Sequence, residues 1–212
     1  MTHRPLLVID GDSLAHRAYH ALPKSIRRKG DLGGGAIVGF ANILLRLFES
    51  EQPRAVLVGW DTLGAPTYRQ ALFPAYQSGR QFDDELVEQL EILPELVAAC
   101  GFANAKAAGY KADDFLAAAV AEEERRGGCA IVTSGDRDAF QLASEATTVL
   151  HPVRAGEMAR IGPIRGSPAL WRGAVTGAGF HSPAGRSVGQ AAGSQRRRPE
   201  RRGRFAAEIS DA

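Results

Sequence analysis

The stretch Leu6-Leu7-Val8-Ile9-Asp10-Gly11-Asp12 decides the fold class of this chain. Four consecutive apolar residues without polar alternation are typical of a parallel strand that is covered on both faces. Two further runs of the same kind occupy residues 55–60 and 130–133. An aspartate follows each run directly or after a short turn, so the sequence predicts buried strands that end in acids.

Helical periodicity fills the segments between these strands. Apolar residues recur at three- and four-residue intervals in residues 36–48, 83–100 and 112–126. We expect Pro94 to kink or restart the second helix, a short helix from Asp136 to residue 143, and an edge strand at residues 147–150. Alternating strands and helices predict an α/β fold with a doubly wound, mostly parallel sheet and helices on both faces.

The composition is typical of a soluble globular protein. Of the 212 residues, 44% are hydrophobic and 24% are charged, with a formal net charge of +2. The apolar run at residues 6–9 is too short for a signal peptide or a membrane span, so a cytoplasmic location is expected. Cys100 and Cys129 lie in apolar runs, which favours packed thiols over a disulfide.

Charge divides the chain near residue 163. Residues 1–162 contain 17 Lys and Arg against 21 Asp and Glu, a net charge of −4, whereas residues 163–212 contain 9 Arg and 3 acids, a net charge of +6. The second segment also holds eight Gly and five Ser and lacks apolar periodicity. We therefore expect one domain at residues 1–162 and a disordered basic tail at residues 163–212.

Seven aspartates follow the predicted strands or open a predicted helix: Asp10, Asp12, Asp61, Asp113, Asp114, Asp136 and Asp138. The carboxyl ends of parallel strands meet at one edge of a sheet, so these side chains should converge there. Each alone has an ordinary explanation as a turn former or helix cap, and Asp12 is expected to cap the helix that follows it. Together they would repel one another, which divalent cations relieve; all-oxygen ligands favour Mg²⁺ or Mn²⁺.

A series of motifs then occurs in a fixed order. They are Leu7-Val8-Ile9-Asp10-Gly11-Asp12-Ser13, Gly39-Phe40-Ala41-Asn42, Val58-Gly59-Trp60-Asp61, Tyr68-Arg69, Ala75-Tyr76-Gln77-Ser78-Gly79-Arg80, Gly109-Tyr110-Lys111-Ala112-Asp113-Asp114 and Val132-Thr133-Ser134-Gly135-Asp136-Arg137-Asp138. The series resembles the bacterial 5′→3′ exonucleases of the flap endonuclease family, among them the N-terminal nuclease domain of DNA polymerase I. The resemblance implies a PIN-like α/β fold with a helical arch inserted after the second strand. It also implies a two-metal enzyme that cuts 5′ flaps and RNA primer remnants.

The resemblance assigns roles to individual residues. It implies that Asp10, Asp61 and Asp136 are catalytic. The implied metal ligands are Asp10, Asp61, Asp113, Asp114, Asp136 and Asp138. Arg69, Tyr76 and Arg80 match arch residues that bind single-stranded DNA by charge and base stacking. The implied partners are DNA with a 5′ flap or 5′ end and RNA primer–DNA junctions, bound by a monomer.

The sequence departs from the family pattern in two places and in the tail. The family motif Tyr-Glu-Ala-Asp-Asp has Lys111 in place of Glu, and the Lys expected after Tyr76 is Gln77. A Lys ammonium beside Asp10 and Asp113 is a fixed cation that lacks the geometry of hydrated Mg²⁺. From residue 163 the Gly-Asp-x-x-Asp motif and the Gly-rich hairpin of the family are absent. The amino-acid sequence there reads like the translation of a shifted reading frame. We therefore expect an incomplete second metal site.

The sequence leaves three alternatives open. A DNA-binding protein of the same fold without useful activity would explain Lys111 and the absent carboxylates. A haloacid-dehalogenase-like phosphatase would explain Asp10-Gly11-Asp12 after a strand, with Thr133 or Ser134 as its phosphate binder, but it leaves the arch motif unexplained. A defective product of a once intact nuclease gene would leave apolar faces of the sheet uncovered.

Overall fold

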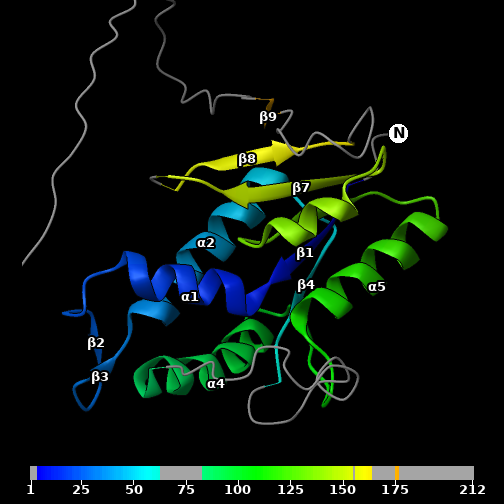
Figure 1. Cartoon of the computed structure of the whole chain (residues 1–212). Helices are drawn as coiled ribbons and strands as arrows, with labels where there is room; N and C mark the ends of the chain where they lie inside the picture. Colours follow the sequence, from blue (N-terminus) through cyan, green and yellow to red (C-terminus); the bar gives the residue numbers. More distant parts are fainter. Residues whose placement is uncertain (1–3, 63–82, 155, 164–174, 177–212) are drawn as a thin grey trace, which may run out of the picture. The chain divides into compact units, whose positions relative to one another are not determined.

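The central element of the fold is a sheet with the strand order β5-β4-β1-β6-β7-β8-β9 (Figure 1). The computed structural model describes residues 4–62, 83–154, 156–163 and 175–176. Five strands are parallel: β1 (Leu6–Asp10), β4 (Ala55–Gly59), β5 (Ala103–Ala105), β6 (Ala130–Thr133) and β7 (Thr147–Pro152). Two are antiparallel: β8 (Met158–Ile161) and β9 (Val175–Thr176). The first strand of the chain thus lies between β4 and β6, in the interior of the sheet.

Helices cover both faces of the sheet. The face that carries Leu7 and Ile9 packs against α1 (Gly11–Ala21), α2 (Gly35–Glu51) and α4 (Asp84–Ala99). The face that carries Val8 packs against α5 (Ala112–Arg125) and residues of the short 3-10 helix η1 (Arg137–Leu142). A small hairpin of β2 (Arg27–Arg28) and β3 (Leu32–Gly33) connects α1 with α2. Because side chains alternate along a strand, the unbroken apolar run of β1 supplies both cores, and the predicted doubly wound α/β fold is confirmed.

Several predictions about single elements are corrected by the structure. β7 is not an edge strand, because β8 pairs with its free side and buries Ala159 and Ile161. Of the kink or restart expected at Pro94, the restart does not occur: α4 continues as one helix, with Leu93 and Val97 buried on the same face. The short helix expected after Asp136 is present, as the 3-10 helix η1. Cys100 is exposed at the end of α4 rather than packed, Cys129 is half-buried, and neither forms a disulfide.

The predicted tail lies largely outside the described residues. Of residues 163–212, the structure describes residue 163 and the two residues of β9, which pair with β8. The domain boundary at residue 162 therefore stays a prediction. Among the helices of the described ranges, none is long and apolar enough to cross a membrane.

The packing of α1 against α2 depends on Gly39. A β-carbon at this position would lie 2.6 Å from the β-carbon of Ala18 and 3.0 Å from Cδ1 of Leu22. We expect Gly39→Val to lower the free energy of unfolding by about 1–3 kcal/mol, because overpacking forces the helices apart. Urea denaturation measures the change. Gly35→Ala is the control, since its β-carbon would approach nothing closer than 3.8 Å; equal effects of the two substitutions would contradict the packing argument.

Candidate metal centre

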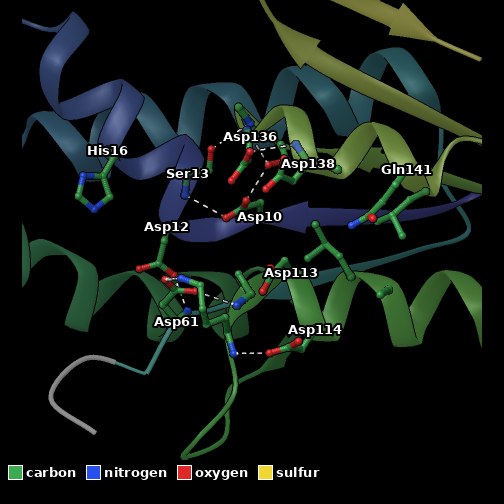
Figure 2. Close-up of a pocket in the computed structure, with 18 residues that line it drawn as sticks. Asp10, Asp12, Ser13, His16, Asp61, Asp113, Asp114, Asp136, Asp138 and Gln141 are labelled. Atoms are coloured by element: carbon green, nitrogen blue, oxygen red, sulfur yellow. Dashed lines mark hydrogen bonds and ion pairs between the residues drawn. The ribbon is translucent and has the colours of Figure 1, made fainter. Parts of the chain in front are cut away.

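All seven aspartates line one pocket at the carboxyl ends of β1, β4 and β6. The pocket has a volume of about 570 Å³, and its other polar lining residues are Ser13, His16, Lys111, Ser134 and Gln141. Figure 2 shows the seven aspartates around the pocket. The predicted convergence of the acids is thus observed, with Asp61 at the same edge as Asp10. The catalytic and metal-binding roles of these acids stay predictions.

Asp10 ends β1 and caps the N-terminus of α1. Its Oδ1 accepts the backbone N–H of Ser13 at 3.0 Å, and its Oδ2 accepts the hydroxyl of Ser134 at 2.7 Å. Burial raises the pKa of Asp10 to about 6, the two hydrogen bonds oppose that rise, and the Asp61 and Asp113 carboxylates add to it. The orientation of this carboxylate is therefore fixed by two chain segments that are far apart in the sequence.

Asp12 does not cap α1, contrary to the prediction, because Asp10 does. It lies in the first turn of the helix, and its Oδ2 accepts the backbone N–H of Asp61 at 2.6 Å. Gly11 permits this close approach, since a β-carbon there would lie 2.5 Å from the ring of the buried Trp60. Asp12 therefore ties the end of β1 to the residue that follows β4 and Trp60.

Lys111 lies in the pocket and pairs with Asp61. Its Nζ lies 2.7 Å from Oδ2 of Asp61, while Oδ1 of Asp61 accepts the backbone N–H of Ala112 at 2.8 Å. The two charged side chains are only 12% and 20% exposed. The sequence predicts this ammonium beside Asp10 and Asp113, whereas the ion pair observed is with Asp61. The bond from Ala112 explains this pairing, because it places the start of α5 against the Asp61 carboxylate.

The turn after β6 completes the pocket wall. Asp136 caps η1 by accepting the backbone N–H of Asp138 at 2.9 Å. The N–H of Asp136 donates to the hydroxyl oxygen of Ser134 at 3.0 Å, and the N–H of Gly135 donates to that of Ser13 at 2.9 Å. The sequence had given Ser134 a role only in the phosphatase alternative and Ser13 none. Serines in the turns that follow two parallel strands were the available signal.

The predicted arch lies outside the described residues. Arg69, Tyr76, Gln77 and Arg80 all belong to residues 63–82, of which the structure gives no description. Their predicted contacts with DNA stay predictions.

On one side of the pocket, the atoms that could bind a metal suit a hydrated divalent cation. Around Asp10 and Asp136 the ligands on offer are carboxylate oxygens, which Mg²⁺ and Mn²⁺ prefer. The described residues contain no group of three or more His, Cys, Asp and Glu side chains that could enclose a metal ion. On the other side the Lys111 ammonium already neutralises Asp61.

We expect the metal-free chain to lose stability as pH rises from about 4 to about 7. Burial raises the pKa of Asp12 from 3.8 to about 7, so the folded state binds this proton more tightly than the unfolded state. The stabilisation is fully present below the unfolded pKa and is lost as pH rises through the folded pKa. Asp12→Asn keeps an oxygen for the Asp61 N–H and should raise the melting temperature in EDTA by roughly 5 °C at pH 8. Little change is expected at pH 4, and equal shifts at both pH values would refute the linkage.

Comparison with known proteins identifies the family. Residues 5–164 match the family model for the 5′-3′ exonuclease, N-terminal resolvase-like domain. DNA polymerase I of Mycobacterium tuberculosis is 35% identical over 161 residues, which cover 74% of this chain and 18% of that protein. DNA polymerase I of Bacillus subtilis is 40% identical over 151 residues, 70% of this chain and 17% of that protein. The chain thus spans less than a fifth of the length of these relatives.

Solved structures confirm the PIN-like fold. The 5′-exonuclease of phage T5 with bound zinc has a TM-score of 0.58 at 21% identity, covering 70% of this chain and 55% of that one. The T5 flap endonuclease in a complex with DNA and metal ions has a TM-score of 0.55 at 20% identity, with the same coverage. At such low identity the likeness bears on the fold alone. With the family match over residues 5–164, it follows that this chain belongs to the 5′-3′ exonuclease family, through its N-terminal resolvase-like domain.

Proposed function

We propose that this chain hydrolyses phosphodiester bonds in DNA as a structure-specific 5′→3′ exonuclease or flap endonuclease. The observation that carries the proposal is the convergence of seven aspartates in one pocket at the carboxyl edge of a parallel sheet. The substrates are DNA with a 5′ flap or 5′ end and RNA primer–DNA junctions, and the chain acts as a monomer in the cytoplasm. The cofactor is Mg²⁺ or Mn²⁺.

The proposed catalytic residues are Asp10, Asp61 and Asp136. Asp113, Asp114 and Asp138 complete the set of metal ligands, and Arg69, Tyr76 and Arg80 guide the DNA strand. A divalent cation at such a site supplies Lewis acidity and an activated water. The protein's own part is to hold the carboxylates in place: Ser13 and Ser134 orient Asp10, and Asp12 holds the backbone of Asp61. The negative field of the pocket attracts the cation and, without one, repels a phosphate.

The test uses the full chain and a DNA duplex with a labelled 5′ flap. Cleavage near the junction of single strand and duplex is expected with Mg²⁺ or Mn²⁺ and not with EDTA. We expect slow cleavage that is faster in Mn²⁺, because Lys111 competes for one carboxylate. Absence of cleavage under all metal conditions, with a folded chain, would refute the nuclease proposal.

A second candidate function is DNA binding without cleavage. The Lys111–Asp61 ion pair favours it, because it places a cation on a carboxylate that the proposed hydrolysis requires. Under this alternative the flap DNA binds in a salt-sensitive manner and stays intact. The phosphatase alternative has no support from the family match, and an aryl phosphate assay should show no turnover.

A further inference from the structure

We propose that Ser134 is a positioning residue that fixes the Asp10 carboxylate and the backbone of Asp136 relative to one another. Ser134 is 1% exposed, directly follows β6, and its hydroxyl contacts Asp10 at the end of β1. The inference rests on the proposed metal-dependent function, since it concerns two of the proposed metal ligands.

The hydrogen bonds of Ser134 leave its hydroxyl one orientation. A serine hydroxyl has a single proton to donate and two lone pairs to accept with. The proton goes to Oδ2 of Asp10 at 2.7 Å, and the oxygen accepts the backbone N–H of Asp136 at 3.0 Å. Since both bonds share one atom, a change in the position of either acid is transmitted to the other.

The backbone of Ser134 is itself held from the neighbouring strand. Its N–H donates to the carbonyl of Leu150 at 3.3 Å, and Nδ1 of His151 lies 3.1 Å from its carbonyl oxygen. On the other side of the turn, Gly135 donates to Ser13, and a β-carbon at Gly135 would lie 2.8 Å from that hydroxyl. Ser134 thus lies in a turn that is fixed at both ends, as positioning requires.

Removal of the hydroxyl has a specific consequence. In Ser134→Ala the Oδ2 of Asp10 loses its donor and the N–H of Asp136 loses its acceptor, both of them supplied by a buried hydroxyl. The Asp10 carboxylate is then free to rotate toward its remaining donor, Ser13. Outer partners of metal ligands typically contribute roughly 10–100-fold to metal affinity, so a loss of that size is expected for Mn²⁺.

Ser144 provides a matched control within the same chain. Its hydroxyl donates to the Glu124 carboxylate and accepts the N–H groups of Ala146 and Thr147 at 3.1 and 3.0 Å. The pattern is like that at Ser134, with one more backbone N–H accepted, but Glu124 does not line the pocket. Ser144→Ala therefore removes equivalent hydrogen bonds and should lower the melting temperature without changing Mn²⁺ affinity.

The experiment measures Mn²⁺ binding by electron paramagnetic resonance of the free ion, on the full chain and on Ser134→Ala, Ser134→Thr and Ser144→Ala. Ser134→Thr retains the hydroxyl and should restore most of the affinity that Ser134→Ala loses. Unchanged affinity in Ser134→Ala, or an equal loss in Ser144→Ala, overturns the proposal.

A crystal structure of Ser134→Ala gives a readout that needs no metal. Rotation of the Asp10 carboxylate away from its position in the unaltered chain supports the positioning role, and an unchanged orientation overturns it. Flap cleavage is measured separately. An unaltered chain that binds Mn²⁺ but does not cut refutes the nuclease proposal, while the Mn²⁺ and crystallographic results still decide the role of Ser134.

Discussion

Replacing Lys111 with Glu is expected to raise the affinity of the pocket for Mn²⁺ by roughly 100-fold, equivalent to about 3 kcal/mol. The substitution removes an ammonium that lies 2.7 Å from Asp61 and adds a carboxylate, a change of two charge units inside a largely buried site. Both changes favour a divalent cation. Isothermal titration calorimetry with Mn²⁺ and Mg²⁺ measures the affinity and the number of ions bound.

Two control variants separate the effect of a charge inside the pocket from the effect of the overall net charge. Lys29→Glu makes the same change of charge at an exposed residue outside the pocket and should leave the affinity unchanged. Lys111→Met removes the cation without adding a ligand and should give an intermediate gain. Should Lys111→Glu bind Mn²⁺ no better than Lys29→Glu, the ammonium does not compete with a metal.

Asp136→Asn is expected to slow flap cleavage by roughly 10²–10³-fold, the usual cost of losing one element of electrostatic stabilisation at a reacting phosphate. Asn retains an oxygen for the backbone N–H of Asp138 at 2.9 Å, so the cap of η1 is preserved. The rate is measured in single-turnover experiments on a labelled 5′ flap with Mn²⁺. Asp136→Asn is also compared with Asp136 in chains that carry Lys111→Glu, where the rate before the substitution at residue 136 should be larger and the loss easier to measure.

Asp31→Asn is the control for Asp136→Asn. Asp31 is 90% exposed at the side chain and has a positive φ of 58°, which Asn tolerates well. Its replacement removes the same charge without touching the pocket. Asp136→Asn that cuts as fast as Asp31→Asn would exclude Asp136 from the catalytic set.

The sequence predicts those strands whose apolar pattern results from burial on both faces. β1, β4 and β6 lie within the apolar core, so their unbroken apolar runs are conspicuous. β5 consists of Ala103-Asn104-Ala105, which is too short to show a period, and the apolar run of β8, Met158-Ala159-Arg160-Ile161, is interrupted by Arg160. Such strands form because a neighbouring strand offers its backbone, and that information lies elsewhere in the chain.

The position of the acids was predictable, but their partners were not. Parallel strand topology alone brings Asp10, Asp61 and Asp136 to one edge. The role of Asp12 depends on the ring of Trp60, which packs against a glycine, and the pairing of Lys111 depends on where α5 begins. These are properties of close three-dimensional packing, and no periodicity in the sequence encodes them.

The interior position of β1 has a consequence for biosynthesis. β1 pairs with residues 55–59 on one side and with residues 130–133 on the other. At roughly 5–20 residues per second, translation takes about 4–15 s to proceed from the end of β4 to the end of β6. During that interval the nascent chain carries an apolar strand with one open edge, which other chains or chaperones can reach. The acidic pocket is absent until the turn at Asp136 has left the ribosome. A chain that stalls before this point therefore lacks the pocket, and its β1 still has an unpaired edge.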